Sequence, residues 1–214
     1  PDVSNVMLGP TGATTSSMLT LSYTYTDQDN DPESGTQIQW FKDDVEQTSL
    51  QGLTVSSSLT SKGQAWKAIV TPSDGSDSGT PMMSNILTIA NSIPTLTAPE
   101  IQPTSPTTDD DLSFSSTTND DDADTVHFDT RWFLDGVLIS ELNDMETLPA
   151  YVTRDGDSWV VEARANDSED VSQWLSSSTV SIGGGITNTA PSVTSIQLTP
   201  ASATTADDVS LSYT

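Results

Sequence analysis

The stretch that decides the fold is residues 27–41, DQDNDPESGTQIQWF, in which an acidic turn leads into an alternating segment that ends in a Trp-Phe pair. The pattern recurs at residues 120–133, DDDADTVHFDTRWF, again with carboxylates at the first, third and fifth positions. Alternating carboxylates in a tight turn supply the oxygen ligands that Ca²⁺ collects, usually about six to eight of them. Each copy therefore predicts one small domain with a candidate calcium-binding turn at one end.

The internal repetition predicts a tandem array. Residues 1–93 and 94–190 form two similar units, called repeat one and repeat two below, and residues 191–214 match the opening of repeat one. We expect that last segment to begin a third repeat, in a chain that is a window of a longer polypeptide. The boundaries read NSIP at 91–94 and NTAP at 188–191. Their prolines restrict the backbone and limit bending between neighbouring repeats.

Alternation with a period of two predicts strands throughout both repeats. In repeat one, Leu19 and Leu21 alternate with Thr and Ser, and a second inward row comprises Trp66, Ala68 and Val70. The corresponding positions of repeat two are Leu112, Phe114, Trp132, Trp159, Val161, Ala163, Val180 and Ile182. No stretch has a helical period. The sequence thus predicts an all-β fold of tandem Ig-like antiparallel β-sandwich domains, since each repeat has the length of one such domain.

Two tryptophan pairs are predicted to stabilise the cores. The chain has no cysteine, so disulfides and thiolate metal sites are excluded. We expect Trp40 to face Trp66, and Trp132 to face Trp159, across each sandwich in place of the missing disulfide.

The charge narrows the range of partners. Thirty-one acidic residues against six basic ones give a net charge of −25, which repels nucleic acid and anionic lipid and favours a cation. No apolar run reaches the roughly 18 residues of a membrane helix, so we expect no membrane insertion in this window. The expected partners are neighbouring repeats of the same chain and other copies in a fibre, with a glycan or a surface protein as further candidates.

The acidic turns supply the candidate metal ligands. In an Ig-like domain, the turn before the Trp strand and the turn before the last strand lie at the same end, near the incoming linker. This places Asp27, Asp29, Asp31 and Glu33 near Asp74, and Asp120, Asp122 and Asp124 near Asp167. The linker residues Asn91 and Asn188 are candidate junction ligands that would bridge two domains. The alternative is a solvated acidic turn, the usual state of a charge run.

Two further features of the sequence bear on function. Trp174 lies in a Ser-rich loop segment, where it is either a partner contact or packed within the loop. For catalysis, the only histidine is His127, and no serine stands in a GxSxG frame. The sequence therefore predicts no enzyme activity in this window.

Taken together, the motifs of this sequence resemble those of a known class of repeats. The acidic turn, the Trp-Phe-x-Asp-Gly hairpin at 132–136, the Gly-x-x-Trp strand starts at 63–66 and 156–159, the TPSDG turn at 71–75 and the NxxP linkers are similar to the tandem Ig-like, PKD-like and cadherin-like repeats of large bacterial extracellular surface proteins. Repeat two departs from this pattern with ANDSED in its last turn, and repeat one departs with Asp44 at the hairpin glycine.

The resemblance implies a cell-surface stalk, adhesin or fibre, with calcium at some domain junctions. Two alternatives remain open from the sequence. One is a glycan- or protein-binding module, and the other is an accessory region of a large secreted enzyme.

Overall fold

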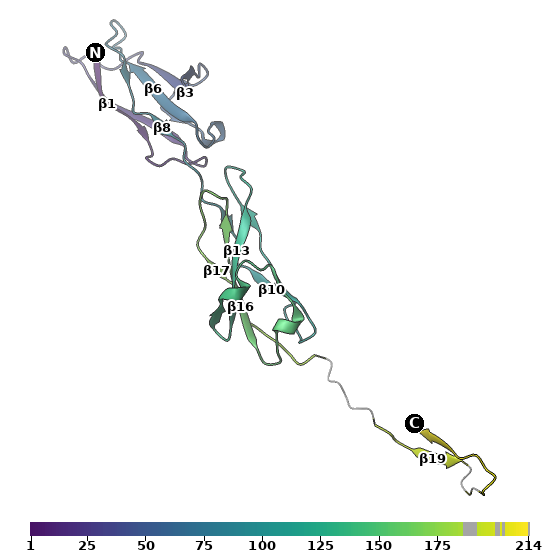
Figure 1. Cartoon of the computed structure of the whole chain (residues 1–214). Coiled ribbons are helices and arrows are strands. Elements are labelled where there is room, and N and C mark those ends of the chain that lie inside the picture. Colours follow the sequence, from purple (N-terminus) through teal and green to yellow (C-terminus); the bar gives the residue numbers. More distant parts are fainter. Residues whose placement is uncertain (186–191, 200–201, 203, 214) are drawn as a thin grey trace.

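The structure is a computed structural model, and it describes residues 1–185, 192–199, 202 and 204–213. Figure 1 shows repeat one and repeat two as two β-structures that follow one another end to end. The strands of every described sheet pair in antiparallel fashion, apart from isolated parallel bridges such as Thr14 with Ala90. The predicted all-β, Ig-like sandwich fold is confirmed.

Repeat one consists of two sheets. One has the order β1-β2-β5, and the other has the order β4-β3-β6-β7, with β8 also paired to β6. The strands are β1 (Asp2–Gly9), β2 (Leu19–Thr26), β3 (Gln37–Lys42), β4 (Val45–Glu46), β5 (Thr54–Val55), β6 (Ala65–Thr71), β7 (Met82–Met83) and β8 (Leu87–Thr88). Alternate residues of β2 and β6 are buried, which is the pattern expected for strands with one face on a core.

Repeat two has the same arrangement. One sheet has the order β10-β11-β15, the other has the order β14-β13-β16-β17 with β18 also paired to β16, and β9 pairs with β12. The strands are β9 (Thr95–Leu96), β10 (Glu100–Gln102), β11 (Leu112–Ser115), β12 (Thr118–Asn119), β13 (His127–Leu134), β14 (Val137–Ile139), β15 (Thr147–Leu148), β16 (Ser158–Asn166), β17 (Leu175–Ser176) and β18 (Val180–Ser181). Further along the chain, β19 (Ile196–Thr199) pairs with β20 (Ser210–Tyr213).

Helical structure among the described residues is confined to short turns. Three 3₁₀ turns occur in loops, η1 (Ser57–Leu59), η2 (Ser140–Leu142) and η3 (Ala150–Val152). No helix in this part of the chain is long and apolar enough to span a bilayer.

Each repeat encloses its own hydrophobic core. The core of repeat one includes Leu19, Trp40 and Trp66, and that of repeat two includes Leu112, Trp132 and Trp159. All four tryptophans are at most 1% exposed. Truncating a buried aromatic of this size to alanine typically costs about 3–5 kcal/mol, so these side chains dominate the stability of the cores.

The predicted placement of the tryptophan pairs across the sandwich is wrong. Trp40 lies on β3 and Trp66 on β6, which are hydrogen-bonded neighbours in one sheet. The rings meet edge to face, with centroids 6.5 Å apart and an interplanar angle of 72°, and Trp132 and Trp159 repeat this geometry. The pairs fill the core beside one another because both strands point these positions inward, so they do not join the two sheets as a disulfide would.

Candidate metal centre at the junction of the two repeats

The acidic turn of repeat two brings three carboxylates together. Asp120 Oδ1 accepts hydrogen bonds from the backbone N–H groups of Asp122 (2.9 Å) and Asp124 (3.1 Å), which curls the turn around this side chain. In this turn, one carboxylate oxygen from each of the three aspartates lies within 4.8 Å of the others. The second oxygen, Asp120 Oδ2, is buried and has no hydrogen-bond partner. A buried carboxylate oxygen without a partner is costly, so this position suits a cation.

A second acidic turn lies after β16 in the same region. Asp167 Oδ1 accepts hydrogen bonds from the N–H groups of Glu169 (2.8 Å) and Asp170 (2.6 Å). Burial alone would raise the pKa of the Asp167 carboxyl, but these bonds, one from Asn91 and the charge of Lys62 hold that pKa below its ordinary value. Asp167 is therefore ionised although it is only 7% exposed.

The linker ties this turn to repeat one. Asn91 Nδ2 donates to Asp167 Oδ2 at 2.8 Å and to Asp170 Oδ2 at 3.0 Å. Its Oδ1 accepts a hydrogen bond from Lys62 Nζ at 3.1 Å. The next residue, Ser92, donates its backbone N–H to Asp122 Oδ2 at 2.5 Å, and its own Oγ is buried without a partner. Two adjacent linker residues therefore contact both acidic turns.

Two side chains of repeat one complete the junction. Lys62 Nζ forms ion pairs with Asp124 and with Glu169, the latter at 2.7 Å, and these carboxylates raise the pKa of the Lys62 ammonium above its ordinary value. Thr15 Oγ1 donates a hydrogen bond to Asp122. One lysine thus stands among six carboxylates, which are those of Asp120, Asp122, Asp124, Asp167, Glu169 and Asp170. The excess of negative charge favours binding of a further cation.

The structure distinguishes among the predicted ligands of repeat two. Asp120, Asp122 and Asp124 form the compact group, whereas Asp167 joins it only through the amide of Asn91. Asn91 lies at the junction as predicted, but its side-chain oxygen accepts from Lys62. Asn188 lies outside the described residues.

In repeat one, Asp74 lies beside the acidic turn as predicted, since it forms a β-bridge with Ser34, but the predicted ligands do not form a compact group of three carboxylates. Asp27 Oδ1 accepts hydrogen bonds from the N–H groups of Asp29 and Asp31, so the turn itself is conserved between the repeats in this chain. Glu33, however, accepts a hydrogen bond from the Tyr23 hydroxyl at 2.7 Å, and Asp74 Oδ1 accepts from two N–H groups of its own turn. Among the described residues, only the group of repeat two places three carboxylate oxygens this close together.

Sequence reasoning missed Lys62, Thr15, Ser92, Glu169 and Asp170. Of these residues, only Lys62 could have been singled out from the sequence. It is one of only six basic residues in a strongly acidic chain, so an ion pair with an acidic turn was to be expected. The others are ordinary loop residues whose role depends on how the end of repeat one meets repeat two.

Trp174 packs against the face of the sheet. The guanidinium carbons of Arg131 and Arg164 lie 4.1 Å and 4.7 Å from the centre of its ring. Arg131 Nε pairs with Glu162 at 2.6 Å, and Arg164 Nε pairs with Asp129 at 2.7 Å. The indole is thus held by two cation–π contacts, each worth about 0.5–1 kcal/mol at an exposed site.

No protein-family model matches the chain, and none of the curated proteins compared with it is significantly similar in sequence. Solved structures with a similar course of strands include the FN1–FN3 domains of chicken CNTN1, at 11% identity, with 98% of this chain and 73% of that chain covered and a TM-score of 0.36. A segment of two fibronectin type-III domains from chicken tenascin has 9% identity, covers 85% of this chain and 99% of that chain, and has a TM-score of 0.41.

A third structure comprises the three N-terminal domains of the Highly Immunogenic Outer Capsid protein of bacteriophage RB49. It has 17% identity, covers 83% of this chain and 58% of that chain, and has a TM-score of 0.32. Similarities of this degree carry no inference about what this chain does.

Proposed function

We propose that the chain is a non-enzymatic structural segment of a bacterial, extracellular cell-surface filament or adhesin stalk, and that its repeat junction is stiffened by calcium. The observation that carries the proposal is the network around Asn91, in which repeat one, the linker and both acidic turns of repeat two contact one another. A spacer needs a junction that resists bending, and charge-assisted hydrogen bonds from several segments supply it.

The residues present fit a calcium ion. Carboxylates of Asp120, Asp122 and Asp124 would hold it, since Ca²⁺ prefers oxygen ligands in irregular arrangements. Asp120 Oδ2 is the buried, unpartnered oxygen of that aspartate, and Ser92 Oγ, which is also buried and unpartnered, would add one more ligand atom in the same region. Because Ser92 belongs to the linker, a bound ion would connect the linker to repeat two and reduce its freedom to rotate.

The expected affinity is that of an extracellular module. Such sites bind calcium with dissociation constants of about 10⁻⁴ to 10⁻³ M. A tenfold excess over that value stabilises the folded state by roughly 1.4 kcal/mol. The ion therefore adds modest stability to one repeat, and its larger effect is on the orientation of neighbouring repeats.

Calorimetric titration of calcium into the chain tests the metal site. We expect binding in the range of about 10⁻⁴ to 10⁻³ M that Asp122→Asn abolishes. Asp29→Asn is the matched control, because Asp29 occupies the same place in the turn of repeat one, where the carboxylates do not converge. Equal loss of binding in both variants, or no heat of binding in the unmodified chain, would remove calcium from the proposal.

A further inference from the structure

The outer edge of β3 is open along part of its length. β3 pairs with β6 from Gln37 to Lys42, but with β4 only at its last two residues. The N–H of Gln47 donates to Trp40 C=O at 2.8 Å, so the backbone of Trp40 faces the β4 side. Alternate residues of an antiparallel strand direct their N–H and C=O groups to the same side, so those of Ile38 face this edge too. Within the described residues, neither group of Ile38 has a hydrogen-bond partner.

In repeat two, the backbone groups at the equivalent edge position are hydrogen-bonded. Thr130 precedes Trp132 as Ile38 precedes Trp40, and its C=O accepts the N–H of Asp144 at 2.8 Å. The N–H of Thr130 donates to Asp144 Oδ1 at 3.2 Å. A loop segment therefore occupies the edge in repeat two. The open edge is a property of repeat one and not of the shared fold.

The loops that follow β4 and β14 differ at this position. The indole N–H of Trp132 donates to Met145 C=O, and that of Trp40 donates to Gly52 C=O, both at 2.8 Å. The residue before each acceptor is Asp144 in repeat two and Gln51 in repeat one. Asp144 has a φ of 60°, the left-handed conformation that turns its N–H and carboxylate toward Thr130, whereas Gln51 does not have a positive φ.

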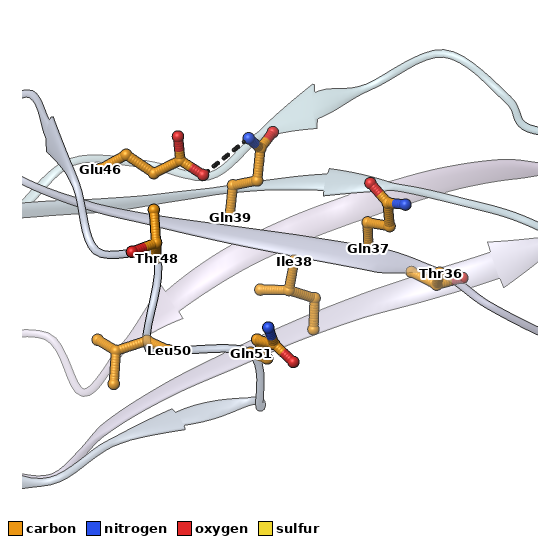
Figure 2. A pocket seen from close by; sticks show the side chains of 8 residues that line it. All are labelled: Thr36, Gln37, Ile38, Gln39, Glu46, Thr48, Leu50 and Gln51. Atoms are coloured by element: carbon orange, nitrogen blue, oxygen red, sulfur yellow. Dashed lines mark hydrogen bonds between the residues drawn. The ribbon is translucent and has the colours of Figure 1, made fainter.

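The loop of repeat one stands off from β3 and leaves a hollow of about 420 Å³. Figure 2 shows Ile38 directed toward the segment that carries Leu50 and Gln51, while Gln37 and Gln39 project from the other face of the strand. The lining is composed mostly of neutral amide, hydroxyl and aliphatic groups. Its one carboxylate is that of Glu46, which accepts a hydrogen bond from Gln39 at 3.0 Å.

We propose that this edge binds an extended polypeptide segment with basic side chains, which adds a strand to β3. The free N–H and C=O of Ile38 form a template that the backbone of an added strand can pair with. The hollow beside Ile38 has amides and hydroxyls for the incoming backbone and aliphatic surface for its side chains. Glu46 and the net charge of −25 favour lysine or arginine in the partner and disfavour a second copy of this chain. The proposal does not depend on calcium.

Amide hydrogen exchange of the whole chain, followed by NMR, tests the proposal. The probe is an acetylated and amidated peptide of alternating lysine and valine, and its mirror-image peptide of D-residues controls for charge attraction alone. We expect the L-peptide to slow exchange of the Ile38 amide by at least about tenfold, because a new strand bond protects it. The Thr130 amide, which is already bonded, serves as an internal control and stays unchanged.

The variant Ile38→Pro removes the donor that faces the edge, at a position where an edge strand tolerates proline. We expect it to lose peptide binding while its thermal unfolding midpoint shows that it is folded. The proposal is overturned if the L-peptide leaves Ile38 exchange unchanged, or if both mirror forms bind equally. Protection of Ile38 that rises with protein concentration alone would identify a second copy as the occupant and would also overturn it.

Discussion

At the scale of single residues, the two repeats differ in whether the indole N–H of their second tryptophan has a hydrogen-bond partner. In repeat one, Gln64 Oε1 accepts hydrogen bonds from the Trp66 indole N–H at 3.2 Å and from the Ser61 N–H at 2.9 Å. In repeat two, the shorter Asp157 accepts only the equivalent N–H, that of Arg154 at 2.8 Å. The indole N–H of Trp159 is therefore buried without a partner. An unsatisfied buried donor costs about 1–3 kcal/mol.

The first prediction follows from this difference. Asp157→Gln supplies the longer side chain of repeat one and should raise the free energy of unfolding of repeat two by about 1 kcal/mol. Urea unfolding monitored by tryptophan fluorescence measures the effect. Gln64→Asp is the reciprocal control and should destabilise repeat one by a similar amount. An unchanged or lowered midpoint for Asp157→Gln would show that the indole is satisfied by other means.

A second prediction concerns Trp174. The stack on Arg131 and Arg164 supports a packing role over the partner contact that the sequence left open. Trp174→Ala should then lower the free energy of unfolding by about 1–2 kcal/mol, the sum of two exposed cation–π contacts. Urea unfolding again provides the value. If the variant is as stable as the unmodified chain, Trp174 does not contribute to packing and a partner contact becomes the favoured role.

At the scale of elements, the junction depends on charges whose titration sets a pH range. The pKa of Asp167 is lowered from its ordinary value of 3.8, so its contribution to stability is present above that value and is lost as the pH falls through the lower folded pKa. The pKa of Lys62 is raised from its ordinary value of 10.5, so its contribution is complete below that value and is lost as the pH rises through the higher folded pKa. The junction is intact between these limits.

The third prediction uses this range. The thermal midpoint of the chain should fall as the pH drops below about 4, and Asp167→Asn should reduce the steepness of that fall. Thermal unfolding over a series of acidic buffers gives both profiles. Because other aspartates also have lowered pKa values, the difference between the two proteins isolates the junction. Superimposable profiles would mean that the Asp167 carboxylate contributes nothing to folding.

The elements also show what the sequence was able to predict. Alternation in β2, β6 and β16 identified buried and exposed faces because a half-buried strand repeats every second residue. The DxDxD pattern identified a turn of one local shape in both repeats, since its hydrogen bonds lie within five residues. The carboxylates that converge in repeat two also make contacts with residues distant in the sequence, such as Asp124 with Lys62 and Asp122 with Ser92. Those contacts have no local signature.

At the scale of the whole molecule, we expect the junction to fix the orientation of the two repeats. Figure 1 shows them joined by a short connection, and the linker itself lies within the charged network. A chain built from such junctions extends as a semi-rigid rod, whereas one with free linkers bends at every boundary. Calcium would add to the network that Lys62 and Asn91 already make.

Residual dipolar couplings of the backbone amides of both repeats, measured with millimolar calcium, test whether the junction is rigid. If the junction is rigid, one alignment tensor fits both repeats, and the combined variant Asp122→Asn and Lys62→Met yields two separate tensors. Two separate tensors in the unmodified chain with calcium present would show that the junction is not rigid, since the repeats would then reorient independently.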